Sequence, residues 1–208
     1  MKMSQKISNH LMLKSVDLCD IGLYHGKMGL VLALYLYSLQ ESLEYIGEFA
    51  WELLQDVYAG VNEALPVGME YGLSGIGYGV SLLKKYGVFD NDLDDVLHSI
   101  DEKIMVYDPC RIKDYSYRSG ALGVYSYIRL RMDIEGKANS LDSQYLKELQ
   151  QTLTKAPNFS NGIPYKMLWQ DLQVPGWNTE DFQGKPIGID GGLAYYLTEV
   201  SHPSNIRG

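Results

Sequence analysis

Cysteine is scarce in this chain of 208 residues, which contains only Cys19 and Cys110. Two cysteines exclude a disulfide scaffold and a metal site built from four thiolates. Basic residues are also in the minority, with 18 lysines and arginines against 26 acids and a net charge of −8. Because a protein that binds nucleic acid needs a basic surface, this balance argues against a nucleic-acid partner.

Long hydrophobic runs are missing as well. The longest, residues 28–39, is shorter than the roughly 18 residues that a membrane-spanning helix needs. Residues 1–17 lack the continuous apolar stretch of a secretory signal. We therefore expect no membrane span and a cytoplasmic location, and we predict that residues 28–39 form a buried core helix.

Glycine, in contrast, is abundant, with 21 residues, and it recurs in a pattern. The pattern is G-x3-G-x2-G followed by an apolar run, complete in two copies and incomplete in two more. The copies are residues 22–29 (GLYHGKMG), 68–75 (GMEYGLSG), 116–123 (SYRSGALG) and 188–195 (GIDGGLAY). Their middle glycines are Gly26, Gly72, Gly120 and Gly192. The first two spacings, 46 and 48 residues, suit two helices and two turns.

Amphipathic segments lie between the glycine copies. Apolar residues recur every three or four positions over 43–61, 93–104 and 141–153, which predicts three helices with one apolar face. Each repeat is therefore a glycine loop, an almost wholly apolar helix, a turn and an amphipathic helix. Stacked hairpins of this kind form an inner and an outer helix layer. We predict an all-α fold that forms one domain over residues 1–208. In this fold the hairpins form a partial or small α/α toroid. The alternative is a homo-oligomer in which a second chain completes the surface.

Residues 155–185 break the repeat. This segment holds prolines, tryptophans and several Asn and Gly residues, and it shows no helical period except near residues 167–172. We predict an irregular insert packed by its own aromatic side chains, with a short helix at 167–172.

The glycine copies carry a family resemblance. The segments GLYHGKMGLVLAL and YGLSGIGYGVSLL resemble the repeated motifs of lanthionine synthetase C-like (LanC-like) proteins, and RSGALGVYSYIRL and IGIDGGLAYYL resemble later repeats of that family. The likeness covers about residues 17–201 outside the insert. It implies an α/α toroid, and catalytic members are zinc enzymes that add peptide cysteine thiols to dehydrated Ser or Thr residues, forming thioether rings.

The family's zinc ligands have no match in this chain. They are two cysteines and a histidine, with one cysteine after a Trp and the other in a Cys-His-Gly triplet, and neither motif occurs here. We therefore predict no zinc cofactor and expect Cys19 and Cys110 to be buried thiols. His25 does match the family's Gly-Leu-x-His-Gly motif, whose histidine in catalytic members is proposed to transfer protons. Together these points predict a peptide-binding or accessory protein of peptide modification.

The two positions before each middle glycine are equivalent in the repeat. If the hairpins stack, these residues gather at the N-terminal ends of the inner helices, where N–H groups are unpaired within the helix. This end would form a polar mouth for a peptide or small-molecule ligand. The candidate catalytic residues are His25, Glu70, Arg118 and Asp190. The candidate substrate-binding residues are Tyr24, Tyr71, Tyr195 and Trp177.

Two alternative functions remain open at this point. A carbohydrate-active α/α-toroid enzyme would use Glu70 and Asp190 as the acid and base of an inverting glycosidase, assisted by His25 or Arg118. A zinc-dependent thioether cyclase would need atypical ligands, such as Cys19, Cys110 and a histidine. Each candidate also has a structural interpretation, in which His25 braces its loop and Arg118 forms an ion pair with an acid.

Overall fold

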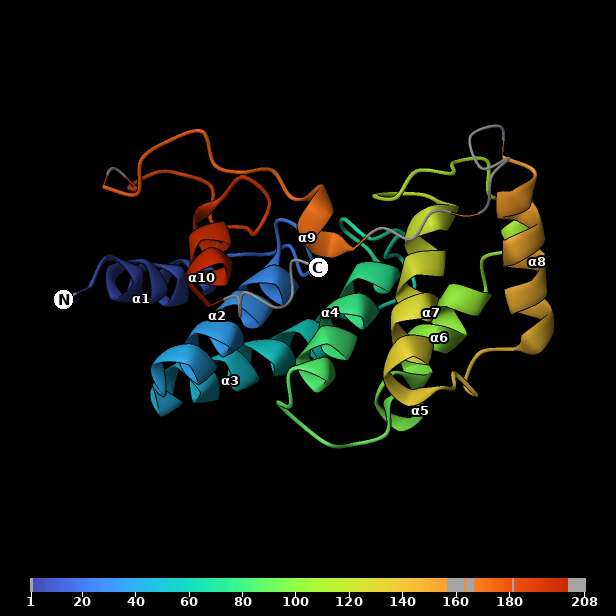
Figure 1. Cartoon of the computed structure of the whole chain (residues 1–208), viewed down its shortest axis with the longest axis horizontal. Helices are drawn as coiled ribbons and strands as arrows, with labels where there is room; N and C mark the ends of the chain where they lie inside the picture. Colours follow the sequence, from blue (N-terminus) through green and yellow to red (C-terminus); the bar gives the residue numbers. More distant parts are fainter. Residues whose placement is uncertain (1, 157–162, 164–166, 181, 202–208) are drawn as a thin grey trace. The chain divides into compact units, whose positions relative to one another are not determined.

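The structure is a computed structural model, and it describes residues 2–156, 163, 167–180 and 182–201. These residues form helices joined by turns and loops, without a β-strand among them (Figure 1). The prediction of an all-α protein is thus confirmed. In the part of the chain that the structure describes, no helix combines the length and apolar character that crossing a membrane requires.

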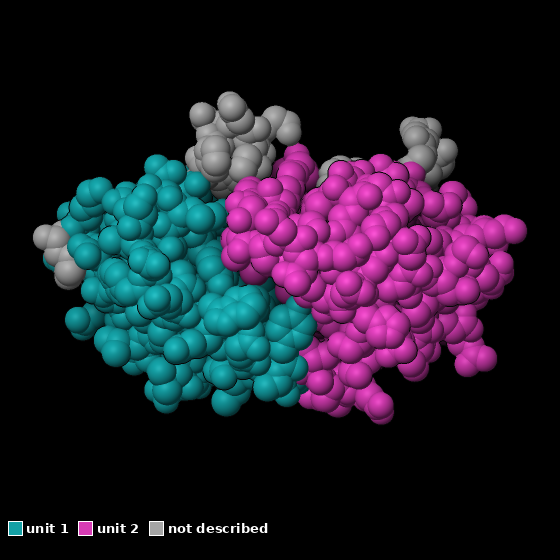
Figure 2. All heavy atoms as spheres, turned by 90° about the horizontal axis from the view of Figure 1, so that it is seen from below, with its two compact units in different colours: residues 1–60, 172–208 teal, residues 61–171 magenta. Residues whose placement is uncertain are grey.

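The chain divides into two compact units, shown in separate colours in Figure 2. Unit 1 consists of Met1–Gly60 and Leu172–Gly208, and unit 2 consists of Val61–Asp171. Unit 1 is therefore assembled from both ends of the sequence, with unit 2 inserted between them. The prediction of one domain over residues 1–208 stays a prediction, because two such units can belong to one domain.

Unit 1 is built around a buried helix. Its helices are α1 (Met3–Ser15), α2 (Lys27–Glu41), α3 (Glu44–Gly60) and α10 (Leu193–Ser201). Every residue of α2 from Met28 to Ser38 is buried, because α3 and α10 pack along it and α1 adds a smaller contact. The buried core helix predicted at 28–39 is confirmed over these residues. The amphipathic helix α3 covers it with an apolar stripe that includes Ile46, Leu53 and Val57.

Unit 2 repeats this plan around two central helices. Its elements are α4 (Leu73–Lys85), α5 (Leu93–Val96), α6 (His98–Met105), the 3-10 turn η1 (Pro109–Arg111), α7 (Ala121–Glu135), α8 (Ser143–Thr154) and α9 (Leu168–Asp171). Helix α4 packs against α7 and α6, and α8 packs against α7 and η1. The single helix predicted at 93–104 is wrong in one respect, since the chain leaves helical geometry at Leu97 and forms α5 and α6 instead.

A buried charge network ties α6 to α7. Arg131 and Asp101 are both fully buried, and the Arg131 guanidinium donates hydrogen bonds to the carboxylates of Asp101 and Asp94. The Tyr127 hydroxyl donates to Asp101 Oδ1 at 2.6 Å, and burial raises the pKa of this tyrosine well above its ordinary value. Removing one partner from this network would leave an unpaired charge in the core.

Candidate functional site

The four glycine copies fold into the same loop. In each, the middle glycine immediately precedes a central helix, and the N–H of the next residue donates to the carbonyl oxygen six residues before that glycine. These bonds are Lys27 to Asp20 (2.8 Å), Leu73 to Pro66 (2.9 Å), Ala121 to Asp114 (2.9 Å) and Leu193 to Pro186 (2.8 Å). A Cβ at Gly72 would lie 2.1 Å from the Pro66 oxygen, so the turn requires glycine at this position. The repeat read from the sequence is therefore a structural repeat.

These loops cap their own helices. The second N–H of three of the helices also donates to a loop carbonyl, namely Met28 to Ile21 (3.4 Å), Ser74 to Val67 (3.1 Å) and Ala194 to Ile187 (3.2 Å). The expectation of unpaired N–H groups at the N-terminal ends of the inner helices is wrong for these positions, because loop carbonyls accept their hydrogen bonds. These N–H groups are consequently engaged by the loop backbone and are not free to bind an anion.

The loops associate in pairs, one pair in each unit. In unit 1 the N–H groups of Ile189 and Asp190, in the fourth loop, donate to the Tyr24 carbonyl of the first loop at 3.0 and 3.2 Å. In unit 2 the N–H groups of Met69 and Glu70, in the second loop, donate to the Arg118 carbonyl of the third loop at 2.8 and 2.9 Å. The donors of the two pairs occupy matching positions of the repeat, and so do the acceptors. The two pairs therefore have the same hydrogen-bond pattern.

The unit 1 pair brings His25 and Asp190 together. Their Nε2 and Oδ2 atoms are 3.9 Å apart. The Asp190 side chain is 4% exposed and its Oδ1 accepts the Gln173 N–H at 2.7 Å, whereas the His25 side chain is 36% exposed. A fixed, buried carboxylate thus faces an accessible imidazole, which can donate or accept a hydrogen bond or a proton. The sequence repeat predicted both residues but not Gln173, which lies in the irregular insert.

The unit 2 pair holds Arg118 between two acids. Its Nη1 lies 3.6 Å from Glu70 Oε1, and its Nε and Nη2 donate to the side chain and the carbonyl of Asp171 at 2.8 and 3.0 Å. The ion pair expected for Arg118 is present, and its assignment as a catalytic residue stays a prediction. Asp171 was missed because it lies outside the repeat, at the end of α9, and only the short helix around it was predicted. Glu70 and Asp190 belong to different units, so their use as a glycosidase pair stays a prediction.

A shared aspartate turn supports the first and third loops. Asp20 Oδ1 accepts the Gly22 N–H at 2.7 Å, and Asp114 Oδ1 accepts the Ser116 N–H at 2.8 Å. The Ser119 hydroxyl also donates to Asp114 at 2.6 Å, and these bonds hold the pKa of that carboxyl below its usual value. Ser119 is therefore part of the loop's internal support.

The four aromatic candidates differ in accessibility. Tyr24 was predicted to contact substrate, but its side chain is fully buried in the core of unit 1, so this assignment is corrected. Tyr71 is half-exposed in the second loop. Tyr195 lies in the first turn of α10 with its hydroxyl 3.1 Å from Glu199. Trp177 packs edge-on against Tyr196 of α10, with ring centroids 5.5 Å apart.

The insert is described only in part. The helix α9 confirms the short helix predicted near 167–172, although it spans Leu168–Asp171. The remainder of the prediction for residues 157–162, 164–166 and 181 falls outside the described residues.

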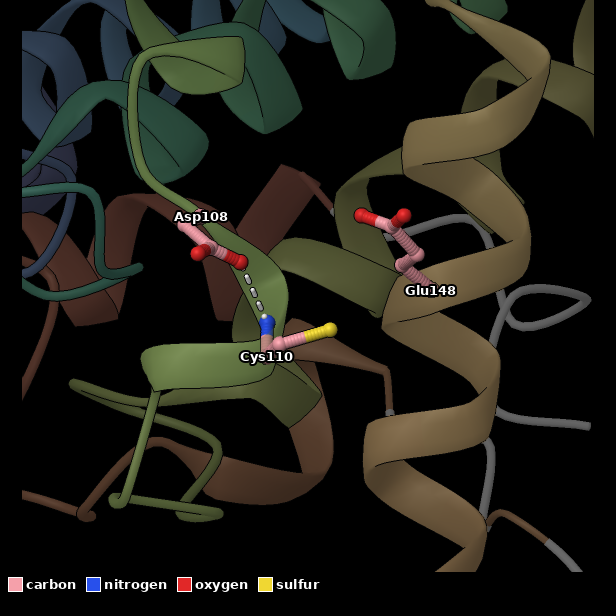
Figure 3. A group of neighbouring side chains, drawn as sticks. All are labelled: Asp108, Cys110 and Glu148. Atoms are coloured by element: carbon pink, nitrogen blue, oxygen red, sulfur yellow. Dashed lines mark hydrogen bonds between the residues drawn. The ribbon is translucent and has the colours of Figure 1, made fainter.

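The cysteines are not arranged as expected. Both are exposed, so their prediction as buried thiols is wrong, and Cys19 lies in unit 1 whereas Cys110 lies in unit 2. Cys110 has two acidic neighbours, since its Sγ and carboxylate oxygens of Asp108 and Glu148 all lie within 4.8 Å of one another (Figure 3). A thiolate and carboxylates are zinc ligands, but this set differs from the two cysteines and histidine of the resemblance. Asp108 is also engaged by the Cys110 N–H and by Arg111.

Comparison with known proteins adds no assignment. No family model and no curated protein matches the chain. The LanC-like resemblance therefore remains a prediction from the glycine motifs.

Proposed function

We propose that this chain is a LanC-like protein that binds a peptide at its glycine loops and acts as an accessory protein of peptide modification, without the family's zinc. The proposal includes the α/α toroid predicted from the repeats. The motifs at residues 22–34 and 71–83, and the common fold of the four loops, support the family assignment. The lack of a Trp-Cys pair and of a Cys-His-Gly triplet supports the zinc-free form.

The observation that carries the binding proposal is the juxtaposition of His25 and Asp190 in unit 1. Asp190 cannot turn away, because the Gln173 N–H holds one carboxylate oxygen and its own N–H is bound to Tyr24. His25 is left accessible on the same loop pair. An extended peptide presents N–H and C=O groups at short intervals, and an imidazole can pair with either kind. Tyr195, in the first turn of α10, has a partly exposed aromatic side chain suited to peptide contact.

The experiment uses a peptide blocked at both ends that contains one dehydroalanine and one cysteine. Its affinity is measured by isothermal titration calorimetry with the whole chain. The variants His25→Asn and Asp190→Asn should weaken binding by about three- to tenfold, the value of one hydrogen bond. His98→Asn is the matched control, since His98 is an exposed histidine of α6 whose ion-pair partner is Glu102.

Alkylation of the peptide after incubation distinguishes binding from catalysis. The proposal expects the cysteine thiol to stay free and to take up the alkylating reagent, as mass spectrometry reports. Absence of binding, or an equal effect of His98→Asn, would overturn the proposal. Loss of the free thiol would show ring formation and favour the cyclase alternative.

A second candidate function is acid–base catalysis by His25, which is favoured by its accessible imidazole and by the Asp190 carboxylate 3.9 Å from its Nε2. In that case His25→Asn would abolish turnover of the peptide while Asp190→Asn would lower its rate. The same alkylation assay tests this candidate, and a thiol that stays free in every sample contradicts it.

A further inference from the structure

Two cavities on unit 2 share one lining residue, Val106. The first has a volume of about 420 Å³ and is lined by Glu63, Leu73, Glu102, Lys103, Val106 and Tyr107. The second has a volume of about 360 Å³, and its lining includes Val106, Asp108, Pro109, Asp142, Tyr145 and Glu148. Both volumes fall in the range of ligand sites. We call the pair the Val106 groove, because Val106 lines both cavities.

The centre of the Val106 groove is apolar and uncovered. Val106 is 82% exposed, the highest value among the large hydrophobic residues that are exposed in the described chain. It follows α6, and Tyr107 beside it is fixed by a hydrogen bond from its hydroxyl to the Leu65 carbonyl at 2.9 Å. Leu73 and Tyr145, one in each cavity, are buried residues and form rigid apolar walls. An apolar side chain placed over Val106 would bury surface on both sides of it.

The charged residues that line the Val106 groove are mostly acidic. Five carboxylates line the two cavities, and Lys103 is the one lysine or arginine among their lining residues. Glu102 Oε1 lies 3.4 Å from His98 Nε2, and Asp108 Oδ2 lies 3.2 Å from Arg111 Nε. Glu63, Asp142 and Glu148 have no ion-pair partner among the residues that the structure describes. Both cavities contain such acids, since Glu63 lines the first and Asp142 and Glu148 line the second.

We infer that the Val106 groove binds an extended peptide segment in which lysine or arginine residues flank an apolar residue. The apolar side chain covers Val106, and the cations reach Glu63 on one side and Glu148 on the other. Charge complementarity selects this occupant, because an acidic segment or a nucleic acid would meet five carboxylates. This inference rests on the proposed function for the peptide nature of the partner, and it supplies the partner's charge pattern at a surface separate from the His25–Asp190 pair.

The test measures fluorescence anisotropy of a blocked, labelled peptide with a Lys-Lys-Leu-Lys-Lys core, added to the whole chain. A matched peptide replaces each lysine with glutamate. The lysine peptide should bind at least about tenfold more tightly, and its affinity should fall as salt is raised. Glu63→Gln and Glu148→Gln, one from each cavity, should each weaken binding by about two- to fivefold, as partly exposed ion pairs do. Val106→Ser should weaken it as well.

Glu52→Gln is the matched control, because Glu52 is an exposed acid of α3 in unit 1 and its loss changes the net charge equally. Equal affinity for the two peptides, or an effect of Glu52→Gln as large as that of Glu63→Gln, would overturn the inference. So would stoichiometric zinc binding that Cys110→Ser abolishes and that displaces the peptide, because the acids would then serve a metal. His25→Asn should leave lysine-peptide binding unchanged. The groove and the His25 site can therefore fail independently.

Discussion

A methyl group at Gly188 should separate the paired loops of unit 1. An ideal Cβ at this position lies 2.5 Å from the Tyr24 carbonyl oxygen and 2.8 Å from His25 Cα, whereas ordinary contacts of this kind begin at 3.4 Å. Both obstacles are backbone atoms, so no side-chain rotation can relieve the clash. The fourth loop must move away, and the bonds from Ile189 and Asp190 to Tyr24, now 3.0 and 3.2 Å, must break.

The expected cost of Gly188→Ala follows from those two bonds. At about 0.5–1.5 kcal/mol each, their loss lowers the free energy of unfolding by about 1–3 kcal/mol. Urea denaturation followed by far-ultraviolet circular dichroism measures this change. The control is Gly176→Ala in the same unit, where nothing lies within 4 Å of the added Cβ, so a neutral result or a gain of up to about 1 kcal/mol is expected.

The equivalent substitution in unit 2 repeats the test. At Gly68 the added Cβ would lie 2.8 Å from Ser119 Cα and 2.9 Å from the Arg118 carbonyl oxygen, so Gly68→Ala should cost about as much as Gly188→Ala. If either variant is as stable as Gly176→Ala, the close pairing of the loops is refuted.

Three further predictions concern the core and the cysteines. The buried Tyr58 hydroxyl has no hydrogen-bond partner among the described residues, and burial raises its pKa to about 12. Tyr58→Phe should therefore stabilise the chain by about 1 kcal/mol at neutral pH. The substitution should also reduce the loss of stability between pH 10 and 12, because in the wild type the unfolded tyrosine ionises in this range before the folded one does. Urea denaturation below and within this pH range checks both effects. A variant that is less stable than the wild type contradicts them. Arg131→Met leaves the Asp101 carboxylate buried without its cation and should lower the free energy of unfolding by about 3–5 kcal/mol. Adding Asp101→Leu should recover much of that loss in a double-mutant cycle. Equal losses of stability in the single and the double variant would contradict the role of the network. Mass spectrometry should find well below one zinc per chain in the wild type, Cys19→Ser and Cys110→Ser alike, and one tightly bound zinc in the wild type would refute the zinc-free proposal.

The starts of the central helices could be read from the sequence. Helices α2, α4, α7 and α10 each begin one residue after a marked glycine, because the loop carbonyl six residues earlier leaves no room for a Cβ there. This constraint is local, so a local pattern reports it. The interruption at Leu97 was harder to see, because the apolar stripe continues across it and both short helices bury the same face.

The pairing of the loops was not predicted, because it depends on contacts between residues far apart in the sequence. A signal for it was nevertheless present. The second and fourth loops share a proline six residues before the middle glycine and an acid two residues before it, whereas the first and third share an aspartate at the earlier position. Each pair joins one loop with the proline to one loop with the aspartate. Glu70 therefore lies near Arg118, and Asp190 lies near His25.

Exposure was the least predictable property of the site. Tyr24 and His25 are neighbours in one loop, yet the tyrosine side chain is buried and the histidine is accessible, because the loop turns between them. The flanking residues of the cysteines, Asp17 and Asp20 around Cys19, and Asp108 and Arg111 around Cys110, indicated exposed turns. The prediction of buried thiols instead followed the general tendency of free cysteine to be buried.

The division of unit 1 between the two ends of the chain has a consequence for its biosynthesis. The ribosome makes the α2–α3 hairpin before unit 2, but α10, which packs along α2, is made only after unit 2. Unit 2 is contiguous and can fold while the nascent hairpin still exposes the apolar flank that α10 will cover. Interruption of synthesis before residue 188 would therefore leave that apolar flank of α2 exposed to chaperones and proteases.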